Sequence, residues 1–249
     1  MSSHQAYSEP VTGLRGADER YRDDRGEADP AVAAALAAYA AGTGSERGVL
    51  AALAASRLLV PVVPVLAGTA PGSDAGTGPA SDTSDKRSEM AIPSLMGQDG
   101  RLAMVAFTST DSLQRWRPAA RPVPVPAGGV FQAAVAESSA VVVDIAGPVP
   151  LTVEGTRLAA LAAGCPVPGM HEDPDVWDLV AAAAGSVAPG IRVRLTPPLA
   201  GAAFTLELAS SPGTAGPVSA EVAAAVADAV YARLAGRVRS AIAVVRRPG

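Results

Sequence analysis

The run Leu58-Leu-Val-Pro-Val-Val-Pro-Val65 is the most apolar stretch of the chain, and its β-branched side chains predict a buried β-strand. Its two prolines limit how that strand can pair. Pro61 and Pro64 lie an odd number of residues apart, so their missing N–H donors fall on opposite edges of the strand. We therefore expect neither edge of this strand to be paired along its whole length.

Two helices are predicted immediately before this strand. Asp29 followed by Pro30 is typical of a helix start, and apolar side chains then recur on one helical face until Gly42. Ser45 is a suitable N-cap for a second, shorter helix whose apolar face also turns inward. The apolar strand therefore follows a pair of helices.

After the strand, apolar runs alternate with turn-forming residues. Residues 67–87 are rich in Gly, Ala, Ser, Thr and Pro, which predicts a flexible insertion. Met90–Met96 and Leu102–Phe107 flank the turn Gly97-Gln-Asp-Gly100 and predict a β-hairpin. Arg121–Pro126 carries three prolines of one parity, so it predicts an edge strand whose missing donors all face outward.

The second half of the chain continues the alternation and sets the predicted fold class. A helix, two strands and another helix are expected at residues 128–138, 140–145, 150–153 and around 158–161. Beyond them, the order helix, strand, strand, long helix, strand is predicted. The fold class is therefore α/β of the α+β type, with a mixed sheet flanked by helices followed by a smaller α-β-β-α-β unit.

The same pattern predicts how the chain divides into domains. Residues 1–28 mix charges of both signs with few apolar side chains, which predicts a disordered tail. We assign residues 29–164 to a first domain and residues 165–249 to a smaller α+β domain, with the Pro- and Gly-rich segment after Cys165 as the boundary. Valines spaced by four from Val218 predict a long helix that packs on the second domain's own sheet.

Several motifs in the first domain resemble the N-terminal domain of the SseB family. They are Leu58-Leu-Val-Pro-Val-Val63, Ser88-Glu-Met-Ala-Ile-Pro93, Asp99-Gly-Arg101, and Phe107-Thr-Ser109 followed by Leu113 and Trp116. The resemblance covers most of Asp29 to Ala163, and the segment after Cys165 distantly resembles the C-terminal domain that often follows. It implies an α/β domain in cytoplasmic bacterial proteins, and it implies no established catalytic residues.

Composition excludes several other classes of protein. A net charge of -4 and a pI near 5.2 give no overall field that would attract nucleic acid or an anionic membrane. Cys165 is the single cysteine, which favours a reducing compartment, and residues 1–28 lack the apolar core of a signal peptide. Leu58–Leu66 is shorter than the roughly 20 residues of a membrane span. We expect a cytoplasmic protein that needs no cofactor and binds no membrane.

The segment from Phe107 to Trp116 is the clearest candidate for binding a ligand or partner. A strand end that runs into a helix start exposes backbone N–H groups that could hold an anion or a peptide carboxylate, and Arg115 and Arg117 lie nearby. Helix capping and core packing explain the same residues without a ligand. The candidate residues are Phe107, Thr108, Ser109, Thr110, Leu113 and Trp116.

Two other groups of residues are candidate functional sites, and a simpler structural explanation is available for each. His171-Glu172-Asp173, with Asp175 and Cys165, could in principle ligate a metal or form a Cys–His pair, but a polar linker that caps the next helix at Asp175 explains them, and we assign no metal site. Five arginines could meet phosphate, although the acidic pI and the lack of neighbouring aromatics favour a solvated face. These are Arg233, Arg237, Arg239, Arg246 and Arg247.

The sequence contains no G-x-S-x-G, Walker lysine or G-x-G-x-x-G motif. We therefore predict a non-enzymatic interaction or regulatory module without catalytic residues, whose partner is a protein. The alternative is a binder of a small anionic ligand, or an enzyme, with its site near the Phe107–Trp116 turn. Nucleic-acid binding through the C-terminal arginines is a third prediction, and we rank it below the other two.

Overall fold

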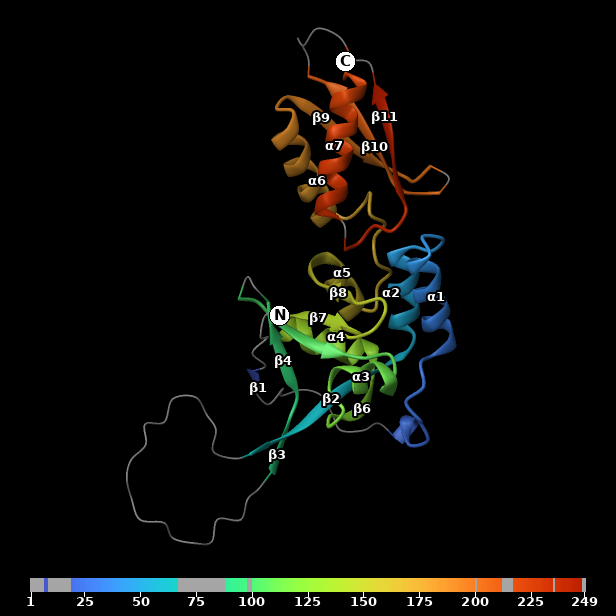
Figure 1. Cartoon of the computed structure of the whole chain (residues 1–249), viewed down its shortest axis with the longest axis vertical. Coiled ribbons are helices and arrows are strands. Elements are labelled where there is room, and N and C mark those ends of the chain that lie inside the picture. The colour runs from blue at the N-terminus through green and yellow to red at the C-terminus, as the bar shows by residue number, and fades with distance from the viewer. Residues whose placement is uncertain are drawn as a thin grey trace, which may run out of the picture.

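The computed structural model describes residues 7–8, 19–66, 88–97, 100–199, 201–211, 217–234 and 236–247. Two groups of elements follow one another along the long axis of the molecule (Figure 1). We call β1 to α5 the first unit and α6 to β11 the second unit. Helices and strands occur in both units, which confirms the mixed α/β class.

The elements of the first unit are β1 (Tyr7–Ser8), η1 (Glu19–Tyr21), α1 (Pro30–Ala40), α2 (Glu46–Ala54), β2 (Arg57–Leu66), β3 (Ser88–Ala91), β4 (Pro93–Met96), β5 (Leu102–Ala106), α3 (Thr110–Trp116), β6 (Arg121–Pro126), α4 (Ala127–Ala136), β7 (Ala140–Val143), β8 (Leu151–Val153) and α5 (Gly155–Ala162). Those of the second unit are α6 (Pro174–Val187), β9 (Ile191–Thr196), β10 (Ala202–Ser210), α7 (Ala220–Arg233) and β11 (Ala241–Arg247). The predicted insertion at residues 67–87 lies outside the described residues.

Side-chain caps begin the helices where the sequence indicated. The Asp29 carboxylate accepts hydrogen bonds from the Ala31 and Val32 amides, and the Ser45 hydroxyl accepts one from the Gly48 amide. Both caps satisfy first-turn N–H groups that have no partner within the helix. The predicted caps of α1 and α2 are thus confirmed.

Strand β2 pairs on both sides, but with different stretches on each. Antiparallel pairing with β6 covers Arg57–Val62 and ends two residues before Pro64. Antiparallel pairing with β3 covers Val63–Leu66 and begins two residues after Pro61. Because each proline removes one donor, the strand changes partner along its length, which confirms that neither edge is paired throughout.

The first unit contains two sheets. The order of the three-stranded sheet is β3-β2-β6, so β6 is an edge strand as its prolines predicted. The order of the five-stranded sheet is β1-β4-β5-β7-β8, in which β5 and β7 are parallel and the other pairs antiparallel. A bridge between Leu59 and Phe107 joins the two sheets.

The predicted hairpin forms, but its first strand is divided. Met90–Met96 was expected to be continuous, whereas β3 ends at Ala91, pairs with β2, and is followed by β4, which pairs with β5. Pro93 lacks a backbone N–H and begins β4, a position that tolerates proline. One apolar run therefore supplies a strand to each sheet.

The second unit has the predicted order α-β-β-α-β and its own apolar cluster. Its sheet has the order β11-β10-β9, with β9 antiparallel and β11 parallel to β10. Val226 and Val230 on α7 are fully buried, while Val222 is half-buried. These helix residues cluster with Phe204 and Leu206 of β10, so the valine stripe packs on the unit's own sheet as expected.

Candidate functional site

The apolar members of the predicted Phe107–Trp116 site are core residues. Phe107 and Leu113 are fully buried in a cluster that also contains Leu59 of β2. The Trp116 ring packs against Phe107, with 5.4 Å between the ring centroids. Arg117 in turn stacks over the Trp116 ring, with its guanidinium carbon 4.9 Å from the centroid. These side chains fix the turn after β5 to the sheets.

The polar start of this turn is held by a residue that sequence reasoning did not select, Asp144. The Thr108 amide donates to Asp144 Oδ1 at 2.9 Å, and the Thr108 hydroxyl donates to Oδ2 at 2.6 Å. Asp144 follows β7 with φ of 52°, a left-handed conformation that is uncommon for a residue with a side chain. Burial raises the pKa of the Asp144 carboxyl, against the lowering effect of these hydrogen bonds. The one available signal was an acidic residue directly after the apolar run Val141–Val143.

Other hydrogen-bonding groups of the turn are also engaged by the chain itself. Ser109 is the N-cap of α3, and its hydroxyl accepts from the Ser112 amide at 3.2 Å. The Thr110 amide donates to the Gly26 carbonyl oxygen at 2.8 Å. Arg57 forms an ion pair with Asp24. Residues that we had placed in the N-terminal tail thus contact the turn predicted to bind a ligand.

A cavity of about 390 Å³ lies beside the turn. Its apolar wall includes Leu36 of α1 and Val149, and its polar wall includes Ser109, Asp111 and Arg115. Leu36 of α1 and the residues of the polar wall lie far apart in the sequence. The sequence alone did not indicate that α1 would cover this turn.

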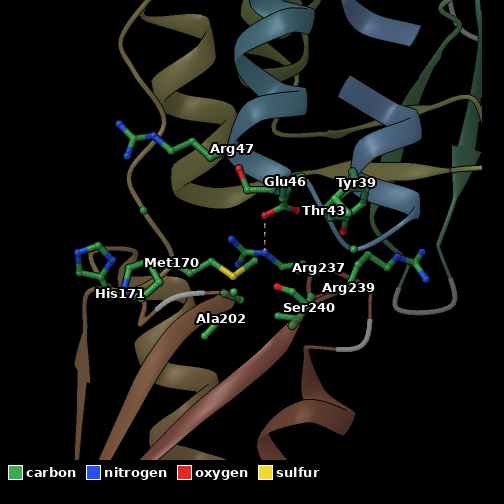
Figure 2. A pocket seen from close by; sticks show the side chains of 18 residues that line it. Tyr39, Thr43, Glu46, Arg47, Met170, His171, Ala202, Arg237, Arg239 and Ser240 are labelled. Carbon is green, nitrogen blue, oxygen red and sulfur yellow. Dashed lines mark hydrogen bonds and ion pairs between the residues drawn. The ribbon is translucent and has the colours of Figure 1, made fainter. Parts of the chain in front are cut away.

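A larger cavity, of about 500 Å³, lies between the two units (Figure 2). The first unit contributes the end of α1, the loop to α2 and the start of α2. The second unit contributes the start of β10 and the segment between α7 and β11, and the linker before α6 contributes Met170 and His171. We call this space the junction cavity.

Glu46 and Arg237, which line the junction cavity, belong to a buried network of four charged side chains. Glu46 Oε1 accepts from Arg157, and Glu46 Oε2 accepts from Arg237 Nε at 3.2 Å. Arg237 Nη2 donates to Asp173 Oδ2 at 2.7 Å. Glu46, Arg157 and Asp173 are each at most 5% exposed. Two arginines and two carboxylates balance one another, and they connect α2, α5, the start of α6 and the segment after α7.

Burial and charge act in opposite directions on the two arginines. Burial lowers the pKa of Arg157, although the nearby Glu46 favours its charged form. Burial also opposes the charge on Arg237, yet Glu46 and Asp173 together raise its pKa. Arg157 Nε has no hydrogen-bond partner in the described part of the chain. The network therefore depends on both carboxylates remaining in place.

The rim of the junction cavity carries further positive charge. Arg47 and Arg239 extend from opposite sides of the cavity in Figure 2, and both side chains are exposed. Among the described residues neither arginine forms an ion pair with a carboxylate, but Arg239 lies 5.8 Å from the centroid of the buried Tyr39 ring. Burial raises the pKa of the Tyr39 hydroxyl, which donates to the Gly236 carbonyl oxygen.

The residues around His171 have separate roles. Asp173, rather than the predicted Asp175, caps α6, because the Asp173 carboxylate accepts from the Asp175 amide. The Asp175 carboxylate instead accepts from the Thr156 amide at 2.8 Å, at the start of α5. Cys165 is exposed. Within the described ranges, no three His, Cys, Asp or Glu side chains gather in the way that a metal ion would need.

Four of the five C-terminal arginines make different contacts, and the fifth, Arg233, is exposed at the end of α7. Arg237 belongs to the buried network and Arg239 lies at the cavity rim. Arg246 donates to the Val218 carbonyl oxygen, and Arg247 pairs with Glu207 at 2.7 Å. Arg237 precedes β11 and Arg247 ends it, so the whole strand separates the two in the chain.

No helix in the described part of the chain is long and apolar enough to cross a membrane. A search of curated proteins and a search of solved structures returned no match. A family model described as the SseB protein N-terminal domain matches residues 32–160. The matched region includes β2, the turn after β5 and Glu46, and it covers just over half of the 249 residues. The chain therefore belongs to the SseB family.

Proposed function

We propose that this protein is a non-enzymatic regulatory module that binds a small organic anion in the junction cavity. The observation that carries the proposal is a cavity of about 500 Å³ whose charged lining is three arginines and one glutamate. Cavities of roughly 300–1,000 Å³ are of the size that holds small molecules and cofactors. The junction cavity is therefore large enough for a ligand of metabolite size.

Charge on the cavity wall favours an anion. Arg237 is neutralised by Glu46 and Asp173, whereas Arg47 and Arg239 have no carboxylate partner within the described residues. A bound carboxylate or phosphate would supply the missing negative charge through charge-assisted hydrogen bonds. The long arginine side chains at the rim can fold over such a ligand from both sides.

Binding without catalysis is supported by the state of the carboxylates. Glu46 and Asp173 are both paired with arginine, so their carboxylate oxygens are already engaged within the chain. The exposed Cys165 does not line the cavity. Among the described lining residues, the geometry thus offers groups that hold an anion, and no cysteine lies beside them.

Regulation is supported by the origin of the lining residues. Arg47 belongs to the first unit and Arg239 to the second, so a ligand that contacts both favours one arrangement of the two units. The lone Cys165 and the SseB family membership support a bacterial, cytoplasmic setting for this module. A protein partner that senses the arrangement would complete the regulatory role.

Thermal shift and calorimetry with a panel of dicarboxylates, sugar phosphates and nucleotides test the proposal. A true ligand at 100 times its dissociation constant stabilises the native state by about 2.7 kcal/mol. We expect Arg47→Gln and Arg239→Gln each to lower the affinity for that ligand about tenfold, because each substitution removes one charge-assisted hydrogen bond. Arg233→Gln is the matched control, because Arg233 is exposed on α7 and does not line the cavity. The proposal fails if no anion stabilises the protein, or if the rim variants bind as well as the control.

A further inference from the structure

The segment Asp24-Arg-Gly-Glu27, which we call the strap, lies across the turn after β5 and is held there chiefly by Arg57. Arg57 Nε donates to Asp24 Oδ2 at 2.6 Å, and Arg57 Nη2 donates to Asp24 Oδ1 at 3.1 Å. This two-point contact is the strongest geometry between arginine and a carboxylate. Both side chains are mostly covered, with 10% of Arg57 and 15% of Asp24 exposed.

Arg57 also binds the peptide backbone on both sides of the contact. Its Nη2 group donates to the Glu27 carbonyl oxygen of the strap. Its Nη1 group donates to the Thr108 carbonyl oxygen at 2.6 Å, which fixes the guanidinium against the turn. Thr108 is itself held by Asp144. The receiving side is therefore rigidly supported and recognises both a carboxylate and a backbone carbonyl.

The strap's middle position accepts glycine only. Gly26 has φ of 77°, and a Cβ atom on it would overlap the Thr110 hydroxyl oxygen. The Gly26 amide donates to Asp24 Oδ1 at 2.7 Å, and its carbonyl oxygen accepts from the Thr110 amide. Arg25, between them, is exposed and has no partner among the described residues. The contacts thus specify an aspartate, any residue, and then a glycine.

The strap is weakly anchored compared with the surface that receives it. Gly26 is the one strap residue that is buried as a whole, beside the covered side chain of Asp24, and η1 before the strap contains no buried residue. Arg57 lies in β2 and Thr108 in a turn bonded to β7, so these groups keep their places when the strap leaves. Segments with few buried contacts open locally at small free-energy cost.

We propose that Arg57 and the Thr108–Thr110 turn form a recognition site for an acidic peptide with aspartate two residues before glycine. The strap occupies this site within the chain, and a matching segment of a partner protein displaces it. The strap thereby acts as an internal competitor that sets how tightly a partner must bind. This site is separate from the junction cavity, and the proposal does not depend on what the cavity binds.

The test uses the full chain and a fluorescein-labelled peptide with the sequence of residues 19–29. Gly26→Val in the chain releases the strap, because valine fits neither the space nor the backbone conformation. We expect the Gly26→Val chain to bind the peptide at least about tenfold more tightly than the wild-type chain, measured by fluorescence anisotropy. An Asp24→Ala chain is the second strap variant, and Arg25→Ala is the matched control that should behave as wild type.

The receiving residues are tested from both sides of the contact. A peptide with Asp24→Ala, and a Gly26→Val chain that also carries Arg57→Gln, should each lose at least about tenfold in affinity. The proposal is overturned if neither strap variant binds the peptide, or if the Asp24→Ala peptide binds equally well. Large losses of melting temperature in both strap variants would show instead that the strap is an integral part of the fold. A wild-type chain that dimerises through Asp24 would assign the site to a second copy rather than to a partner.

Discussion

The turn after β5 and the junction between the units both hold buried charges, but they satisfy them differently. In the turn, Asp144 accepts hydrogen bonds from Thr108, and Arg57 forms an ion pair with Asp24 of the strap. All of these residues belong to the first unit. At the junction, Glu46 is matched by Arg157 and Arg237, which lie 111 and 191 residues away. The buried charges of the turn therefore find their partners within one unit, whereas those of the junction find them only when both units are in place.

This difference teaches which site is open to an outside ligand. The Thr108 amide, the Thr110 amide and the Ser109 hydroxyl are already engaged by the chain, so a ligand that uses these groups must displace an existing contact. The junction leaves Arg47 and Arg239 without carboxylate partners in the described part of the chain, so an anion there need not displace a carboxylate of the chain. The sequence motif pointed to the first place, and the available charge lies at the second.

Removing Glu46 should have the largest effect, because two arginines depend on it. In Glu46→Ala, the buried Arg157 keeps its charge without a partner, and we expect a loss of about 3–5 kcal/mol in the free energy of unfolding. Scanning calorimetry should also show the two units melting more independently, since the network connects them. Urea titrations supply the free energies.

Glu137→Ala is the control for this experiment. Glu137 is exposed at the end of α4 and forms no ion pair among the described residues, so its replacement should change stability by less than about 0.5 kcal/mol. If Glu46→Ala were equally neutral, the junction network would contribute nothing to the association of the units.

Removing Asp144 should have an intermediate effect confined to the turn. Asp144→Ala leaves the Thr108 amide and hydroxyl without acceptors and puts alanine at a positive φ, for a combined loss of about 2–4 kcal/mol. Asp144→Asn should lose less, because asparagine retains one acceptor oxygen and tolerates this conformation. Denaturant unfolding measures both variants. Equal losses would contradict this, because they would mean that the one acceptor oxygen kept by asparagine does not stabilise the turn.

Acidification should have the smallest effect, and it acts through the strap. The hydrogen bond from Arg57 lowers the pKa of the Asp24 carboxyl, against the effect of its partial burial. A folded-state pKa below the unfolded value of about 3.9 gives stability that is present above that pH and lost as the pH falls below it. The difference in unfolding free energy between the wild type and Asp24→Asn should therefore shrink from pH 7 to pH 3.

The buried Asp144 carboxyl acts in the opposite direction, because its raised pKa makes the folded state less stable as the pH rises. Since Asp144 is present in both proteins, its contribution cancels from that difference. An unchanged difference between pH 7 and pH 3 would show that the Asp24–Arg57 ion pair does not stabilise the fold.

The sequence by itself determined the local structure of this protein. Asp29 and Ser45 cap helices where the sequence indicated, because a cap is completed by amides two or three residues away. The prolines of β2 and β6 determined where pairing must change or stop, since a missing N–H removes a ladder bond wherever the chain folds. The order of elements in the second unit also followed from periodicity.

Only the tertiary structure decided which charged residues form the buried ion pairs between the units. Glu46 occupies the first turn of a helix, where an acidic residue is ordinary, and nothing near it in sequence indicates two arginine partners. Arg237 was one of five similar arginines, and the cap of α6 was predicted at Asp175 rather than at Asp173. Their roles depend on how the units pack, because charges far apart in the chain interact strongly only when folding brings them together away from water.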